Sequence, residues 1–171
     1  MKNTLIIFLS LLCNSLAIAQ QSEISKSKIT IESVKGTYIL VAVDNILANG
    51  SRIHLYGDKP QGMLMFDSKG NYTLQIMSSG RPKFSSGDKS KGTDEENRAA
   101  IKGCNTHFGT YTIDDTTHTI TFNITHASFP NWEGVQQKRP FTLIENIFTY
   151  TVPSPTTGGA VTGEVVWKRV E

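Results

Sequence analysis

Cysteine is scarce in this sequence, and its scarcity excludes a disulfide framework. Cys13 and Cys104 are the two cysteines among 171 residues. Cys13 lies in an N-terminal segment that we predict to be removed, so Cys104 would remain alone and stability would come from a hydrophobic core. A lone thiol can act as a nucleophile or form an intermolecular bridge, and a buried cysteine is also a common small hydrophobe.

The motifs of common enzyme classes are missing as well. There is no Gly-x-Ser-x-Gly elbow, no His-Glu-x-x-His metal motif and no phosphate-binding glycine loop. The four histidines, His54, His107, His118 and His126, lack a metal-ligand spacing. The 17 basic and 15 acidic residues nearly balance, and no basic block is interleaved with aromatics. We therefore expect no cofactor, no metal and no nucleic-acid partner.

Long hydrophobic runs are absent too, and the run at residues 5–12 is too short for a membrane span, which needs about 20 apolar residues. It follows the positive charge of Lys2 and precedes an A-x-A triplet at residues 17–19, as in a cleavable signal peptide. We expect cleavage after Ala19 and a periplasmic or secreted protein. A lipid anchor on Cys13 would need a small residue at the position of Leu12.

What the sequence does contain is a series of short segments with period-two alternation, separated by turn residues. In the clearest segment, residues 119–129, Ile120, Phe122 and Ile124 alternate with polar side chains. We expect the cluster Asp44-Asn45 to end the first segment. This pattern predicts an all-β fold of about eight to ten antiparallel strands, in a closed barrel or a sandwich. The predicted strands are residues 37–43, 62–66, 71–77, 106–113, 118–127, 135–143, 147–152 and 161–170.

One stretch departs from the β pattern. Residues 78–90 are polar and contain Gly80, Pro82 and Gly87, so they read as a surface loop. Thr93 and Glu96 then form a capping box, which predicts one short helix over residues 94–102 that stops at Gly103. Such a helix could be a lid at the mouth of a barrel or a plug in its open end.

Several segments together resemble the bacterial lipocalin-like domain family. They are GTY (residues 36–38), PQGMLMF (60–66) leading through Gly70 to Tyr72, RPKF (81–84) with Gly87-Asp88, the capped helix, GTY (109–111), FPNWEG (129–134) and VWKR (166–169). The resemblance implies a closed lipocalin-like barrel at 36–171, which follows the predicted signal peptide at 1–19 and an N-terminal segment at 20–35. It also implies a central cavity for a small apolar molecule, and in some relatives a role in pathways to aromatic or polyketide products.

The resemblance also implies a pair that closes the barrel. In lipocalins an aromatic ring of the first strand is covered by an arginine from the last strand. The corresponding residues here are Tyr38, where lipocalins usually have tryptophan, and Arg169. A cation–π contact of this kind contributes about 0.5–1 kcal/mol at exposed sites.

Candidate cavity residues follow from the alternation. His126 continues the face of Ile120, Phe122 and Ile124, and Arg139 shares a face with Phe141 and Leu143. Both would point inward and orient the polar end of a ligand, unless they lie at a wet rim. Other candidates, for which core or corner packing is the alternative, are Trp132, Asn131, Tyr72 and Tyr111.

We therefore expect a barrel that binds a small apolar molecule. The alternatives are a cofactor-free cyclase or isomerase, in which His126 or a tyrosine moves a proton, and an interaction module with a filled core.

Overall fold

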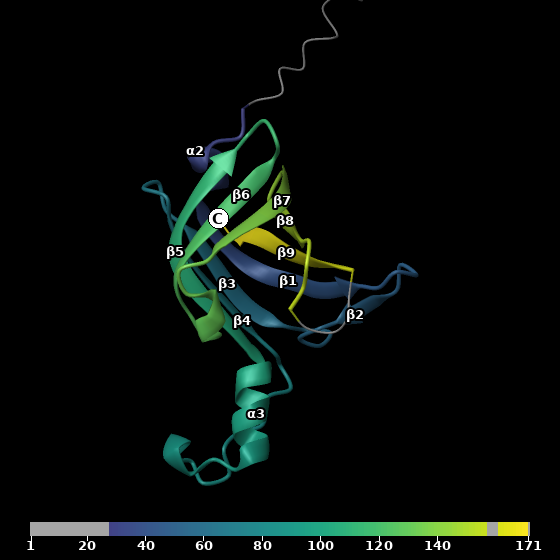
Figure 1. Ribbon diagram of the computed structural model, residues 1–171, viewed down its shortest axis with the longest axis vertical. Helices are drawn as coiled ribbons and strands as arrows, with labels where there is room; N and C mark the ends of the chain where they lie inside the picture. Colours follow the sequence, from purple (N-terminus) through teal and green to yellow (C-terminus); the bar gives the residue numbers. More distant parts are fainter. Residues whose placement is uncertain (1–27, 157–160, 171) are drawn as a thin grey trace, which may run out of the picture.

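The computed structural model describes residues 28–156 and 161–170, and the predicted signal peptide lies outside these ranges. Nine strands form one antiparallel sheet, in the order β2-β1-β3-β4-β5-β6-β7-β8-β9 (Figure 1). The strands are β1 (Gly36–Ile46), β2 (Arg52–His54), β3 (Gln61–Phe66), β4 (Asn71–Met77), β5 (Cys104–Asp114), β6 (Thr119–Ala127), β7 (Gln136–Ile144), β8 (Ile147–Val152) and β9 (Thr162–Val170).

The sheet closes because β1 also pairs with β9, from Thr37 opposite Val170 to Ile46 opposite Thr162. Eight strands therefore make a closed barrel, and β2 adds a short hairpin to the far half of β1. Closure leaves fewer open edges than a sandwich of the same strands would. The predicted fold class, a closed antiparallel barrel with one short helix, is confirmed.

One end of the barrel is filled by aromatic side chains. Phe66 lies at their centre, and its ring centroid is 4.6 Å from that of Tyr111 and 5.6 Å from that of Phe148. A short helix, α2 (Ile31–Val34), covers this end and buries Val34 completely. The sequence did not predict α2, because four residues are too few for a helical period to show.

Arg169 joins α2 to the barrel wall. Its guanidinium lies 5.1 Å from the centroid of the Tyr38 ring and donates hydrogen bonds to the Tyr38 hydroxyl and to the Ser33 carbonyl. The Tyr38 hydroxyl in turn donates to the Val34 carbonyl, at 2.7 Å. Tyr38 and Arg169 are also direct partners in the β1–β9 ladder. The two strands that close the barrel therefore also hold the helix that covers it.

Two irregularities in strand pairing change which residues face inward. In β1 the register with β9 shifts between Leu40 and Ala42. Before the shift the buried positions have even numbers, as at Tyr38 and Leu40, and after it Val43 and Asn45 are buried. The strand continues through Asp44 and Asn45 to Ile46, so the prediction that this pair ends the first strand is wrong. The strand can continue because the Asp44 carboxylate accepts hydrogen bonds from side chains of β2.

The second irregularity lies in β6, where the register with β5 shifts between Phe108 and Gly109. Phe108 pairs with His126 and Gly109 pairs with Ile124, which leaves Thr125 as an extra residue. The strands approach so closely here that a Cβ on Gly109 would lie 2.0 Å from the Asn123 carbonyl oxygen. This bulge reverses the alternation for the last residues of β6.

The long connection between β4 and β5 carries η1 (Lys89–Lys91) and α3 (Asp94–Lys102), which has the predicted bounds and capping box. Figure 1 shows α3 projecting from the end of the barrel that lies away from α2. No residue of α3 is buried, so the helix does not plug the barrel. In the part of the chain that the structure describes, no helix is long and apolar enough to cross a membrane.

Candidate functional site

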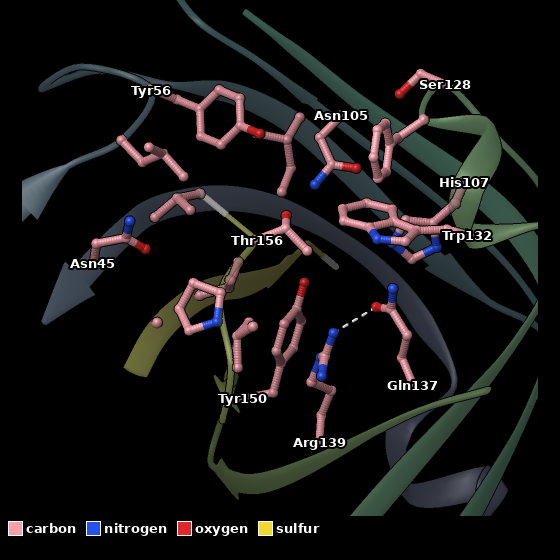
Figure 2. Close-up of a pocket in the computed structure, with 18 of the residues that line it drawn as sticks. Asn45, Tyr56, Asn105, His107, Ser128, Trp132, Gln137, Arg139, Tyr150 and Thr156 are labelled. Atoms are coloured by element: carbon pink, nitrogen blue, oxygen red, sulfur yellow. Dashed lines mark hydrogen bonds between the residues drawn. The ribbon is translucent and has the colours of Figure 1, made fainter. Parts of the chain in front are cut away.

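The half of the barrel away from α2 is hollow. It holds a cavity of about 480 Å³, which is lined by residues from the ends of the strands and from the loops that follow them (Figure 2). Cavities of about 300–1,000 Å³ typically hold small molecules. The walls are mainly apolar, and the lining residues that carry this character are Val43, Leu55, Ile76, Val135, Val152 and Val165.

Apolar side chains also surround the mouth of the cavity. Ile101 of α3 is 67% exposed, and Phe129, which follows β6, is 44% exposed, yet both line the cavity. Trp132 in η2 (Pro130–Trp132) packs edge-to-face against Phe129, with the ring centroids 5.5 Å apart. A ligand that fills the cavity would meet an apolar rim as it enters.

A buried histidine forms one polar part of the wall. His107 on β5 is 6% exposed, and its Nδ1 atom lies 2.8 Å from the Tyr72 hydroxyl on β4. Burial, with a smaller effect from the nearby charge of Arg139, lowers the pKa of His107 to about 4. Burial raises the pKa of Tyr72. At neutral pH the pair is therefore an uncharged imidazole and a protonated phenol.

Arg139 on β7 forms the second polar part. Its Nη2 atom donates to Gln137 Oε1 at 2.6 Å, and its Nη1 atom donates to the Lys138 carbonyl at 3.3 Å. Within residues 28–156 and 161–170, no carboxylate lies within ion-pair distance of this guanidinium. Burial lowers the pKa of Arg139 below its usual range, because desolvation disfavours the charged form.

Tyr150 and Asn105 are further polar residues of the lining. Tyr150 on β8 is buried beside Arg139, and burial raises its pKa to about 12, so its hydroxyl stays protonated at neutral pH. Asn105 on β5 lies on the opposite wall in Figure 2, and its buried Oδ1 atom has no hydrogen-bond partner among the described residues. The cavity thus offers a ligand hydrogen-bonding groups on two walls.

The acidic residues of the lining, Asp44 and Glu164, are paired with basic side chains. Arg52 on β2 donates to Asp44 Oδ2 at 3.0 Å and to Glu164 Oε1 at 2.6 Å. His54 Nδ1 lies 2.8 Å from Asp44 Oδ1, and this contact raises the pKa of His54. The cluster links β2 to β1 and to β9.

Of the candidate residues from the sequence, Arg139 and Trp132 line the cavity. Tyr72 does not line the cavity, but its hydroxyl contacts His107, which does. Tyr111 belongs to the filled half, where its hydroxyl donates to the Asp67 carbonyl at 2.9 Å. Asn131 is exposed in η2 and is not part of the lining.

The expectation that His126 points into the barrel is wrong. The bulge at Thr125 turns His126 outward, where its ring centroid lies 5.6 Å from that of Phe108, and its Nδ1 lies 3.3 Å from Glu133 Oε1. The inward position near the end of β6 belongs to Ala127, which packs against the core.

Polar residues of the lining that sequence reasoning missed include Asn105, His107, Gln137 and Tyr150. For His107 a signal was present, because the alternation of residues 106–113 places it on the same face as Tyr111. Gln137 likewise shares the face of Arg139. No cluster of three or more His, Cys, Asp or Glu side chains that could hold a metal occurs among the described residues.

Comparison with protein-family models matches residues 35–170 to the lipocalin-like domain. Comparison with curated proteins and with solved structures gives no match. The matched range covers every strand of the barrel, and the closed antiparallel topology agrees with it. The resemblance seen in the sequence motifs is thereby confirmed. The chain belongs to the lipocalin-like domain family.

Proposed function

We propose that this protein binds a small, largely apolar molecule in the hollow half of its barrel, in the periplasm or outside the cell after removal of residues 1–19. The observation that carries the proposal is the cavity of about 480 Å³ with mainly apolar walls. Burial of apolar surface contributes about 25 cal/mol per Å², so a ligand that fills such a space gains most of its affinity from the walls.

The cavity argues against an interaction module with a filled core. A small barrel packed by its own side chains leaves almost no internal space. Here the aromatic packing around Phe66 ends within the half covered by α2, and the other half stays open.

The protonation states favour binding over a cyclase or isomerase reaction. A group that moves a proton works best when its pKa lies near the working pH. Burial moves the pKa of His107 down to about 4 and that of Tyr150 up to about 12, away from neutrality in both cases. Both groups are therefore suited to hold fixed hydrogen bonds.

Filling the cavity should weaken binding. Val165 on β9 lines the cavity and is buried, so Val165→Phe places a ring in the ligand space. We expect the affinity for the uncharged fluorescent probe N-phenyl-1-naphthylamine to fall at least about tenfold, because the probe and the new ring compete for one apolar volume. Val166→Phe is the matched control, since Val166 is the next residue along β9 and faces outward.

Fluorescence titration of the parent and both variants measures the affinity for the probe, and thermal unfolding shows that each variant is folded. Equal probe affinity in Val165→Phe and Val166→Phe, or no binding by the parent protein, would contradict the proposal.

A further inference from the structure

We infer that the ligand carries an acidic group, ionised as a carboxylate or a planar anion of similar shape, and that Arg139 binds it. This inference rests on the proposed function and specifies the chemical class of the ligand. It begins from a mismatch in the cavity: the wall is mainly apolar, yet it contains the guanidinium of Arg139, for which the described residues supply no anion.

Arg139 has hydrogen-bond donors that remain available for such an anion. Two of the five N–H donors of the guanidinium are used, by Gln137 Oε1 and the Lys138 carbonyl. Three donors remain without an acceptor in the described part of the chain. The planar fork of an arginine matches the two oxygens of a carboxylate, and this pairing is among the strongest hydrogen-bonded contacts in proteins.

The acidic groups of the lining do not fill this role. Asp44 and Glu164 are both paired with Arg52, and Asp44 also contacts His54. Neither carboxylate lies within 4.0 Å of Arg139 nitrogen atoms, although both residues line the same cavity. The anion that completes Arg139 therefore has to come from outside the chain described here.

The neighbours of Arg139 also suit an anion. The Tyr72 hydroxyl has no acceptor in the described residues other than His107 Nδ1, so we assign its proton to that contact. A neutral His107 then carries its own proton on Nε2, as a second donor in the cavity wall. The protonated Tyr150 hydroxyl lies beside the guanidinium in Figure 2. A cation beside one uncharged donor, in a wall that also carries the His107 N–H, favours a negatively charged oxygen over a neutral one.

A matched pair of probes tests the inference. Dodecanoate and 1-dodecanol have the same apolar chain, and they differ in the ionised carboxylate. We expect the parent protein at pH 7 to bind dodecanoate about 10- to 100-fold more tightly than dodecanol, in competition with N-phenyl-1-naphthylamine. Arg139→Met, which keeps an unbranched apolar stem and removes the charge, should abolish this preference and leave dodecanol affinity within about twofold.

The control variant is Lys168→Met, which removes the same charge from the outer face of β9. It should retain the preference for dodecanoate. Thermal unfolding of Arg139→Met provides a second readout. We expect that the melting temperature does not fall, because a guanidinium without a carboxylate partner does not stabilise the fold through an ion pair.

The outcomes separate the inference from the proposed function. Equal binding of dodecanoate and dodecanol by the parent overturns the inference and leaves the proposed function standing, and this comparison needs no variant to fold. A preference that survives Arg139→Met, or that disappears equally in Lys168→Met, also overturns it. Failure of the parent to bind dodecanoate, dodecanol and the uncharged probe overturns the proposed function itself.

Discussion

At the scale of single residues, His107 shows how burial fixes the charge of a side chain. The imidazole is packed between Tyr72 and Trp132, with ring centroids 5.4 and 6.0 Å away. Its pKa of about 4 lies below the value of about 6.5 for an exposed histidine. The unfolded chain therefore takes up a proton at a pH where the folded protein does not, and protonation favours unfolding.

His107 should thus make the protein less stable in weak acid. Its contribution is complete above pH 6.5 and is lost as the pH falls toward 4, by about 2 kcal/mol at pH 5. The raised pKa of His54 acts in the opposite direction, and the lowered pKa values of Asp67, Asp114 and other carboxyls act only in stronger acid. Urea unfolding at pH 7 and pH 5 measures the loss. The variant His107→Asn should lose about 2 kcal/mol less than the parent, and an equal loss in both proteins would refute this account.

Arg139 and His126 show what alternation can and cannot predict about single residues. Both were placed inward by the same rule. Arg139 follows it, because β7 pairs with β6 without a shift between Thr119 and Asn123 and thus keeps its period of two. His126 does not follow it, because one extra residue in β6 lies between the last regular position and the histidine. A polar residue near a strand end is therefore a weaker candidate than one in the middle of a regular strand.

At the scale of elements, the strand boundaries and the capped helix were largely predictable, and the bulges were not. Strand segments and α3 are encoded locally, by alternation and by the Thr93–Glu96 capping box. A bulge depends on the partner strand as well. The sequence holds one hint, Gly109 inside a strand, because an interior glycine often marks a bulge or a close approach of two backbones. Which residue of β6 becomes the extra one is decided by the pairing across the barrel.

Gly109 should accordingly tolerate no side chain. In Gly109→Ala the new methyl group meets the Asn123 carbonyl oxygen and the Thr125 nitrogen, which are backbone atoms that cannot rotate away. We expect a loss of about 3 kcal/mol or more in the free energy of unfolding, at the upper end for an overpacked position. Gly80→Ala is the control, because nothing lies within 4 Å of the position that a Cβ would take there. Urea denaturation gives both values, and similar stability of the two variants would show that the strands can separate at the bulge at little cost.

At the scale of the whole molecule, the two halves of the barrel along its axis differ: one is filled and the other is hollow. The half under α2 holds the aromatic packing and the Tyr38–Arg169 contact, and the other half holds the cavity. The family and the barrel could be predicted from motifs spread along the chain. The division into a filled and a hollow half could not, because it depends on how side chains from strands far apart in sequence meet inside the barrel.

The proposed export of the protein gives a prediction about its mature form. Lys2, the apolar run and the A-x-A triplet predict cleavage after Ala19. N-terminal sequencing of the protein recovered from the periplasm or the medium of its own host should therefore begin at Gln20. A protein that keeps Met1, or one that carries lipid on Cys13, would contradict the proposed location and would leave the cavity argument unaffected.

The pairing of β1 with β9 also bears on how the chain folds. Thr37 lies opposite Val170, so the contact that closes the barrel joins residues near the two ends of the described chain. Proteins dominated by such distant contacts fold slowly, in about milliseconds to seconds. Closing a long loop costs conformational entropy before the contact that it forms contributes any stabilising energy. During synthesis the N-terminal part of the chain emerges first, so the pairing of β1 with β9 cannot form until β9 has been made. Until then one edge of β1 stays open, which gives a chaperone or a second nascent copy a strand on which to bind.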